Sequence, residues 1–179
     1  MPAENITLVA TWTINQYTIT FDTDGGTEIA AITQDYNTAI TAPANPTKTG
    51  YTFAGWTKNG AAATIPETMP AESYTLVAQW DILTNLTVTY DPNGGYFTAD
   101  DSTAAKVVND VTFNSALNPG EVARDGYTLA GWFDAAEGGN AMPATMPGEN
   151  ATYYAQWIAG SATAYTIEYY YQNAADLTA

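Results

Sequence analysis

Large apolar residues and threonines alternate with a period of two in several short stretches of the chain. Residues 17–21 read Tyr-Thr-Ile-Thr-Phe, and residues 86–90 read Leu-Thr-Val-Thr-Tyr. Residues 74–80 and 153–157 show a similar alternation, and each of these two stretches ends in a tryptophan. Because successive side chains of a strand point to opposite faces, this pattern predicts half-buried β-strands whose apolar face is turned to a core.

Turn signals follow the two opening strands. Asp24-Gly25 and Asn93-Gly94 supply residues that tolerate a positive φ, so each opening strand is predicted to turn sharply into a hairpin. The segment 42–48 contains prolines, which exclude a central strand. It is predicted to form a loop or one short helical turn.

Three sequence motifs recur in the same order, which indicates tandem repeats. The first is an apolar-threonine alternation that ends in Asp-x-x-Gly-Gly, the second is Gly-Tyr-Thr-x-Ala-Gly-Trp, and the third runs from Met-Pro-x-Glu to a tryptophan. The copies lie at 17–26 and 86–95 for the first motif, at 50–56 and 126–132 for the second, and at 1–12, 69–80 and 146–157 for the third.

The spacing of these copies predicts the domain organisation. Residues 16–82 form a first repeat of about four strands, and residues 83–159 form a second repeat with a seven-residue insertion between its turn and its Gly-Tyr motif. Residues 1–15 match only the closing strand of a preceding repeat, and residues 160–179 match only the opening strand of a following one. We therefore interpret the chain as a piece of a longer tandem array.

The repeated motifs resemble those of a known family. The centre Pro-Thr-Lys-x-Gly-Tyr-Thr-Phe-x-Gly-Trp and the closing Thr-Leu-x-Ala-Gln-Trp, together with the Asp-x-x-Gly-Gly turn, are similar to the Listeria–Bacteroides repeat, also called the internalin B-repeat. The resemblance implies a mostly β (α+β) fold of tandem β-grasp-like modules with at most one short helix, whose first and last strands are parallel neighbours. It also implies a module of large secreted or wall-anchored bacterial surface proteins, without catalytic residues.

Composition excludes many chemical functions. Four Lys and Arg residues stand against 19 Asp and Glu, and the formal net charge of -15 disfavours binding to nucleic acid. Without histidine or cysteine the chain can form no Ser-His-Asp or Cys-His triad, no thiolate metal site and no disulfide. No stretch approaches the roughly 18 apolar residues of a membrane span, so this segment is not expected to insert into a membrane.

Carboxylates therefore remain as the main candidates for catalysis. Asp100 and Asp101 are adjacent and would point to opposite faces of a strand, and the pair Asp134 and Glu137 has no counterpart in the first repeat. A domain that is repeated for catalysis should repeat its catalytic groups. We expect neither an enzyme nor a cofactor.

Three features have both a structural and a functional interpretation. Asp22 and Asp24 resemble the start of a calcium loop, but the turn alone explains these residues, so we expect no metal. Lys106 lies among apolar residues, as a lysine of a Lys–Asn cross-link would, yet an exposed edge-strand lysine is the better interpretation. Trp56 or Trp132, with Tyr96 and Phe97, could form an accessible aromatic patch that binds a ligand.

These observations lead to one expected function and one alternative. We expect a non-catalytic extracellular stalk of a bacterial cell-surface or cell-wall protein that displays a distal adhesive domain. The alternative is an adhesive module that itself binds a host protein or glycan through exposed aromatic residues. The expected partners are neighbouring repeats of the same chain, and the chain is expected to be a monomer with weak head-to-tail association through residues 6–12 and 165–171.

Overall fold

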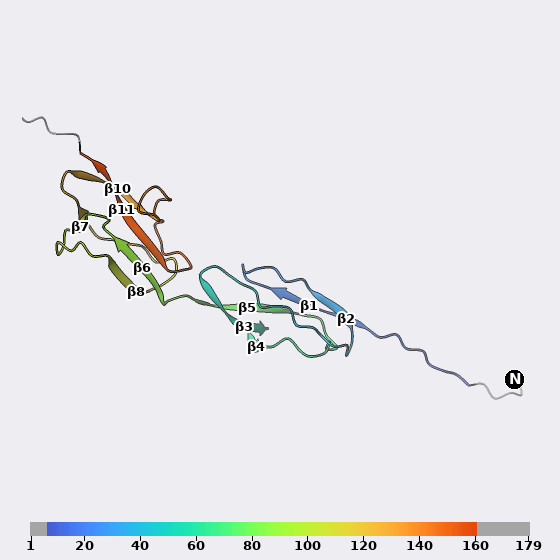
Figure 1. The fold of residues 1–179 in the computed structure, drawn as a ribbon. Coiled ribbons are helices and arrows are strands. Elements are labelled where there is room, and N and C mark those ends of the chain that lie inside the picture. The colour runs from blue at the N-terminus through green and yellow to red at the C-terminus, as the bar shows by residue number, and fades with distance from the viewer. Residues whose placement is uncertain (1–6, 161–179) are drawn as a thin grey trace, which may run out of the picture. The chain divides into compact units, whose positions relative to one another are not determined.

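The computed structural model describes residues 7–160, and in this part of the chain it contains eleven β-strands and no helix (Figure 1). The residues group into two compact units. Of the described residues, unit 1 comprises those up to Thr89 together with Lys106–Asn118 and Pro143–Thr152. Unit 2 comprises Tyr90–Ala105, Pro119–Met142 and the described residues from Tyr153 onward. The mostly β fold predicted from the sequence is confirmed.

Unit 1 holds a five-stranded sheet. Its strands, in sheet order, are β2 (Ile32–Asp35), β1 (Gln16–Asp22), β5 (Tyr74–Ile82), β3 (Tyr51–Lys58) and β4 (Ala61–Ala63). β1 and β5 run parallel, whereas the other neighbouring pairs are antiparallel. The first and last strands of the first repeat are therefore parallel neighbours within the sheet, as the family resemblance implied.

The core of this sheet uses the apolar positions of the alternating stretches. Ile19 and Leu76 are fully buried, and Phe21 keeps only 8% of its surface exposed. Thr20, which stands between two of these side chains on β1, is exposed. Full burial of one such aliphatic side chain contributes about 1.5–3 kcal/mol. The buried cluster consists of Ile19, Phe21, Trp56, Met69, Leu76 and Ala78.

The turn after β1 forms where the sequence predicted it, but a tight hairpin does not follow. Asp24 and Gly25 have positive φ values of 46° and 81°, and the backbone N–H of Asp24 donates to Asp22 Oδ1 at 3.0 Å. The next residues pair with a distant loop before β2 begins, since the N–H of Thr27 donates to the carbonyl of Thr47 at 2.9 Å. The antiparallel partner of β1 is therefore β2, which begins only at Ile32 and pairs with Gln16–Ile19.

The second glycine of the turn lies against the closing tryptophan of the same repeat. A Cβ atom on Gly26 would be 2.5 Å from Trp80 Cζ2, and Trp80 Nε1 donates to a carbonyl of the turn at 3.1 Å. Trp157 covers Gly95 in the same way, and its Nε1 donates to the preceding turn at 3.0 Å. The Gly-Gly motif and the closing tryptophan of each repeat are therefore two halves of one contact.

The second repeat builds a four-stranded sheet and a two-stranded sheet. The first has the order β10 (Tyr127–Phe133), β11 (Ala151–Ala159), β6 (Leu86–Asp91) and β8 (Lys106–Val111), and the second pairs β7 (Tyr96–Phe97) with β9 (Val122–Ala123). The predicted alternation is confirmed on β6, where Leu86, Val88 and Tyr90 are 7%, 1% and 1% exposed. Lys106 is exposed at the start of β8, an edge strand, as the preferred interpretation predicted.

The flanking segments differ from the repeats. Residues 7–15 form no strand, and 91% of Leu8 and 89% of Trp12 are exposed. The closing strand expected over residues 1–15 is thus not formed by its described part. The predicted opening strand at 165–171 lies outside the described residues.

Candidate functional site

The aromatic residues proposed from the sequence as a ligand patch lie largely in the interior. Trp56 is 7% exposed, Trp132 is 8% exposed and Phe97 is 6% exposed, while Tyr96 is half-buried on β7. Trp132 stacks on Phe97 with the ring centroids 6.4 Å apart. These side chains therefore do not form the accessible patch that the sequence indicated.

A β-bulge explains why Trp56 is buried. Simple alternation places Trp56 opposite Phe53, but the pairing of β3 with β5 shifts register between Phe53 and Gly55, where Gly55 has a φ of 132°. An extra residue in one strand returns the next side chain to the same face. The two rings consequently meet, with centroids 5.2 Å apart. The pairing of β10 with β11 shifts in the same way before Trp132.

The calcium-loop candidates are used in turns. Asp22 Oδ1 accepts the N–H of Asp24 at 3.0 Å, and Asp91 Oδ1 accepts the N–H of Asn93 at 2.8 Å. These are the hydrogen bonds by which an aspartate stabilises a turn two residues ahead. Within residues 7–160 no three acidic side chains gather as metal ligands.

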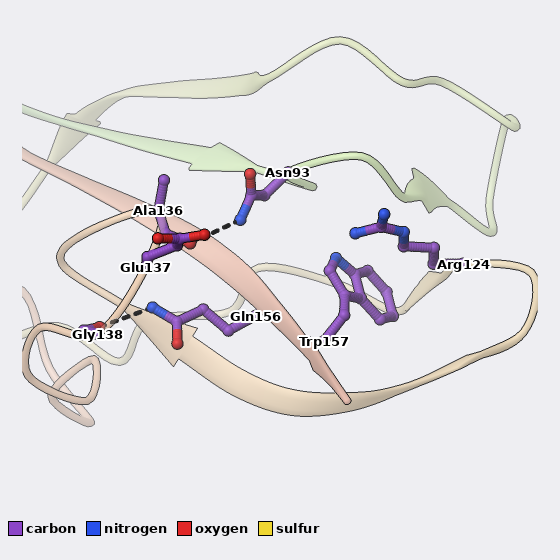
Figure 2. Close-up of a pocket in the computed structure, with 7 residues that line it drawn as sticks. All are labelled: Asn93, Arg124, Ala136, Glu137, Gly138, Gln156 and Trp157. Atoms are coloured by element: carbon purple, nitrogen blue, oxygen red, sulfur yellow. Dashed lines mark hydrogen bonds between the residues drawn. The ribbon is translucent and has the colours of Figure 1, made fainter. Parts of the chain in front are cut away.

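An open cavity of about 570 Å³ lies in unit 2 (Figure 2). Asn93 lies in the turn after β6, Arg124 directly follows β9, and Gln156 and Trp157 lie on β11. The loop after β10 completes the wall. The full lining is Asn93, Arg124, Ala136, Glu137, Gly138, Gln156 and Trp157.

Hydrogen bonds hold that loop in place over the cavity. Gln156 Nε2 donates to the carbonyls of Ala135 and Gly138 at 2.9 and 2.6 Å. Asn93 Nδ2 donates to the carbonyl of Ala136 and to that of Ala155, each at 2.9 Å. Both amide hydrogens of each side chain are thereby used, so the wall of the cavity is built by specific contacts.

Asp134 closes the base of the same loop. The N–H of Asn140 donates to Asp134 Oδ1 at 2.7 Å, and Asn140 Nδ2 donates to Oδ2 at 2.9 Å. These hydrogen bonds, that of the side chain first, lower the pKa of Asp134 below 3.8 because they favour the carboxylate. Asp134, a carboxylate candidate of the sequence, therefore has a structural partner, whereas Glu137 is exposed at the cavity.

Arg124 is the cation of the cavity. Its Cζ lies 4.0 Å from the centroid of the Tyr127 ring. A Cβ atom on Gly94 would be 3.3 Å from an Nη atom of Arg124, so the guanidinium also lies over the turn. Lys48 and Lys58 form salt bridges with Asp24 and Glu72, whereas Arg124 has no carboxylate partner within residues 7–160.

The first repeat provides a natural comparison for this arrangement. Lys48 and Asp24 occupy the motif positions of Arg124 and Asn93, and Lys48 Nζ donates to the backbone carbonyl of Asp24 at 2.7 Å and lies 3.4 Å from its Oδ2. The hairpin between β3 and β4 is short there, since Lys58 pairs with Ala61. Two changes, aspartate to asparagine and a longer loop, thus accompany the cavity of the second repeat.

Sequence reasoning did not find this cavity. The signals were present, because the chain has a single arginine, Arg124, at the position of a lysine, and residues 135–139 extend a loop that is short in the first repeat. The orientation of the Asn93 amide and the path of the loop are tertiary features that no motif encodes.

Comparison with known proteins gives the family. The Listeria-Bacteroides repeat domain matches residues 17–79 and 87–156, which together are well over half of the chain. The chain therefore belongs to the Listeria-Bacteroides repeat family, and the resemblance drawn from its motifs is confirmed. No solved structure gives a significant match.

Two relatives show where such repeats occur. Internalin H of Listeria monocytogenes is 36% identical over 167 residues, which are 86% of this chain and 28% of that protein. A protein of Evansella cellulosilytica named "Putative membrane protein" is 32% identical over 171 residues, which are 89% of this chain and 25% of that protein. The chain thus spans about a quarter of the length of these relatives. It is a repeat module of a surface-associated protein family.

One further observation concerns membranes. The residues that the structure describes include no helix of the length and hydrophobicity that a membrane span requires.

Proposed function

We propose that this chain is a non-catalytic spacer of a large extracellular protein at a bacterial cell surface or cell wall. In this role its repeats hold a more distal adhesive domain away from the cell. Family membership and the similarity to Internalin H support this setting.

The observation that supports a spacer best is how the repeated residues are used. Residues that recur in both copies build the fold: Trp56 and Trp132 lie in cores, and Gly26 and Gly95 receive the closing tryptophans. The repeated aspartate before each turn accepts a backbone N–H. The residues that recur in both repeats thus stabilise the fold, as expected for a module that is duplicated to add length.

Contacts inside unit 1 connect residues of both repeats. The N–H of Phe113 donates to the carbonyl of Leu83 at 2.8 Å, and the ring of Phe113 lies 5.6 Å from that of Tyr51. Phe113 also covers Gly50. Unit 1 therefore includes residues of both repeats, so the segment between them is part of a compact unit.

The alternative role, adhesion through exposed aromatic residues, has less support. Trp56, Trp132 and Phe97 are each less than 10% exposed, so a ligand could not reach their ring faces without local opening. The net charge of -15 instead favours a soluble, mutually repelling array.

In the test, an epitope tag is displayed on a bacterial surface with no copy, one copy or two copies of residues 16–159 between the tag and the cell. A spacer predicts that binding of a large antibody to the tag rises with copy number. An unrelated rigid domain of similar length should serve equally well. Antibody binding that is independent of copy number, or that rises only with the native repeats, would contradict the spacer role.

A further inference from the structure

The cavity of unit 2 combines a cation, an aromatic ring and hydrogen-bond acceptors. We propose that it binds a sugar that carries one carboxylate, with Arg124 holding the carboxylate and Trp157 lying beside the sugar ring. The spacer role needs no ligand, so this inference goes beyond it and can fail without affecting it. The volume of about 570 Å³ falls within the range of roughly 300–1,000 Å³ that is typical of small-molecule sites.

Arg124 is preorganised to bind a carboxylate. The Cζ atom of its guanidinium lies over the ring of Tyr127, 4.0 Å from the ring centroid. The five N–H donors of an arginine lie in the guanidinium plane, so a contact on the face leaves the edge available. Such an edge matches a carboxylate with two parallel hydrogen bonds. The Tyr127 ring and the nearby turn at Gly94 restrict the position of the fork before a ligand arrives.

The comparison between repeats shows that this cation lacks the internal anion of its counterpart. Lys48 is 3.4 Å from the carboxylate of Asp24, whereas the equivalent Asn93 is neutral and gives its amide hydrogens to Ala136 and Ala155. Asparagine in place of aspartate at this position therefore leaves Arg124 without an internal carboxylate and adds two hydrogen bonds to the wall of the cavity.

The other lining groups accept hydrogen bonds. Both Nε2 hydrogens of Gln156 are used by the loop, which leaves its Oε1 as the remaining polar atom. Glu137 adds an exposed carboxylate to the same wall. Acceptors at this end bind hydroxyl donors, and the negative charge of Glu137 disfavours ligands with more than one anionic charge. A sugar carboxylate offers a single anion together with several hydroxyls.

Trp157 supplies the surface for the sugar ring. It is half-buried, and its Nε1 is tied to the carbonyl of Pro92 at 3.0 Å, so the indole is held in one orientation. Figure 2 shows Trp157 beside Arg124, with Gln156 and Glu137 farther along the wall. The carboxylate of one monosaccharide would meet Arg124, its ring would meet Trp157, and its hydroxyl groups would meet Gln156 and Glu137.

The experiment is a titration of the full chain with sodium glucuronate, followed by NMR. The indole N–H signal of Trp157, assigned with Trp157→Phe, and the side-chain amide of Gln156 are the readouts. Glucose and inorganic phosphate serve as the uncharged and the non-sugar ligand, all at equal ionic strength. We expect saturable shifts with glucuronate and an affinity at least about tenfold higher than for either comparison ligand.

Variants assign the effect to Arg124. Arg124→Met should weaken glucuronate binding at least about tenfold, whereas the matched Lys48→Met in the first repeat should leave it unchanged. Asn93→Asp should also weaken binding, because it provides the internal carboxylate that Asp24 provides to Lys48. Thermal unfolding of each variant shows that the fold is intact. Absence of saturation with glucuronate, equal binding of glucose or phosphate, or full binding by Arg124→Met would each overturn the proposal.

Discussion

Two leucines in identical sequence surroundings should differ greatly in their contribution to stability. Residues 7–10 and 75–78 both read Thr-Leu-Val-Ala, yet Leu76 is fully buried in the sheet of unit 1 and Leu8 is 91% exposed. The perturbation is therefore Leu76→Ala, with Leu8→Ala as its control. The four-residue sequence is the same in both cases, so a large difference between the two variants reports tertiary burial.

The magnitude follows from the atoms removed. Leu76→Ala deletes three buried carbon atoms at about 0.8 kcal/mol each, or roughly 2.4 kcal/mol, and the cavity left behind brings measured losses into the range of about 2–5 kcal/mol. A repeat of this size is stabilised by only about 3–10 kcal/mol. A loss of 3 kcal/mol would thus lower Tm by at least about 12 °C. Leu8→Ala should change stability by less than about 0.5 kcal/mol.

Thermal unfolding followed by circular dichroism measures both variants, and amide hydrogen exchange locates the effect. Protection should fall on β1 and β5 in Leu76→Ala and remain at the wild-type level in Leu8→Ala. Equal losses of Tm in the two variants, or a stability of Leu76→Ala equal to that of the wild type, would refute the assignment of the core.

Three further outcomes are expected. Gly95→Ala places a methyl group against the ring of Trp157 and should cost about 3 kcal/mol or more in chemical denaturation, whereas Gly60→Ala meets nothing within 4 Å and should cost only the backbone strain of about 1–2 kcal/mol. Because the pKa of Asp134 is lowered, its stabilisation of the cavity loop is complete above pH 3.8 and is lost as the pH falls through the lowered pKa. Amide hydrogen exchange of the loop in acid should show this loss. Asp134→Asn should remove the pH dependence. Burial, the largest cause, raises the pKa of Tyr74 above 10.0. The contribution of Tyr74 to stability is therefore complete below pH 10.0 and should decline as the pH rises through the raised pKa. Tyr74→Phe should abolish that decline when unfolding is measured as a function of pH.

Local patterns were sufficient to predict several of the strands and part of the cores. Alternation with a period of two identified the buried faces of β1, β5 and β6, because that signal depends only on the pleat. The parallel pairing of Ile19 with Tyr74 was available only from the family resemblance. No motif between β1 and β5 indicates that β5 pairs with β1.

The burial of Trp56 and Trp132 could not be derived from alternation. Each follows a glycine at a β-bulge, and a single extra residue reverses the face on which every later side chain lies. The cavity was hidden for a related reason. Its wall depends on the path of residues 135–139 and on the direction of the Asn93 amide, and both are set by contacts with β11.

The contact of Trp80 with the opening turn has a consequence for how a repeat is made. Its Nε1 bonds a carbonyl that lies 57 residues earlier in the chain, and β5 pairs with both β1 and β3. During synthesis the earlier strands would emerge without the strand that joins them, so the repeat would acquire its structure in one late step rather than strand by strand. Pairing over such distances is slow to nucleate. A chain that stops before β5 would therefore yield an unfolded segment instead of a smaller domain.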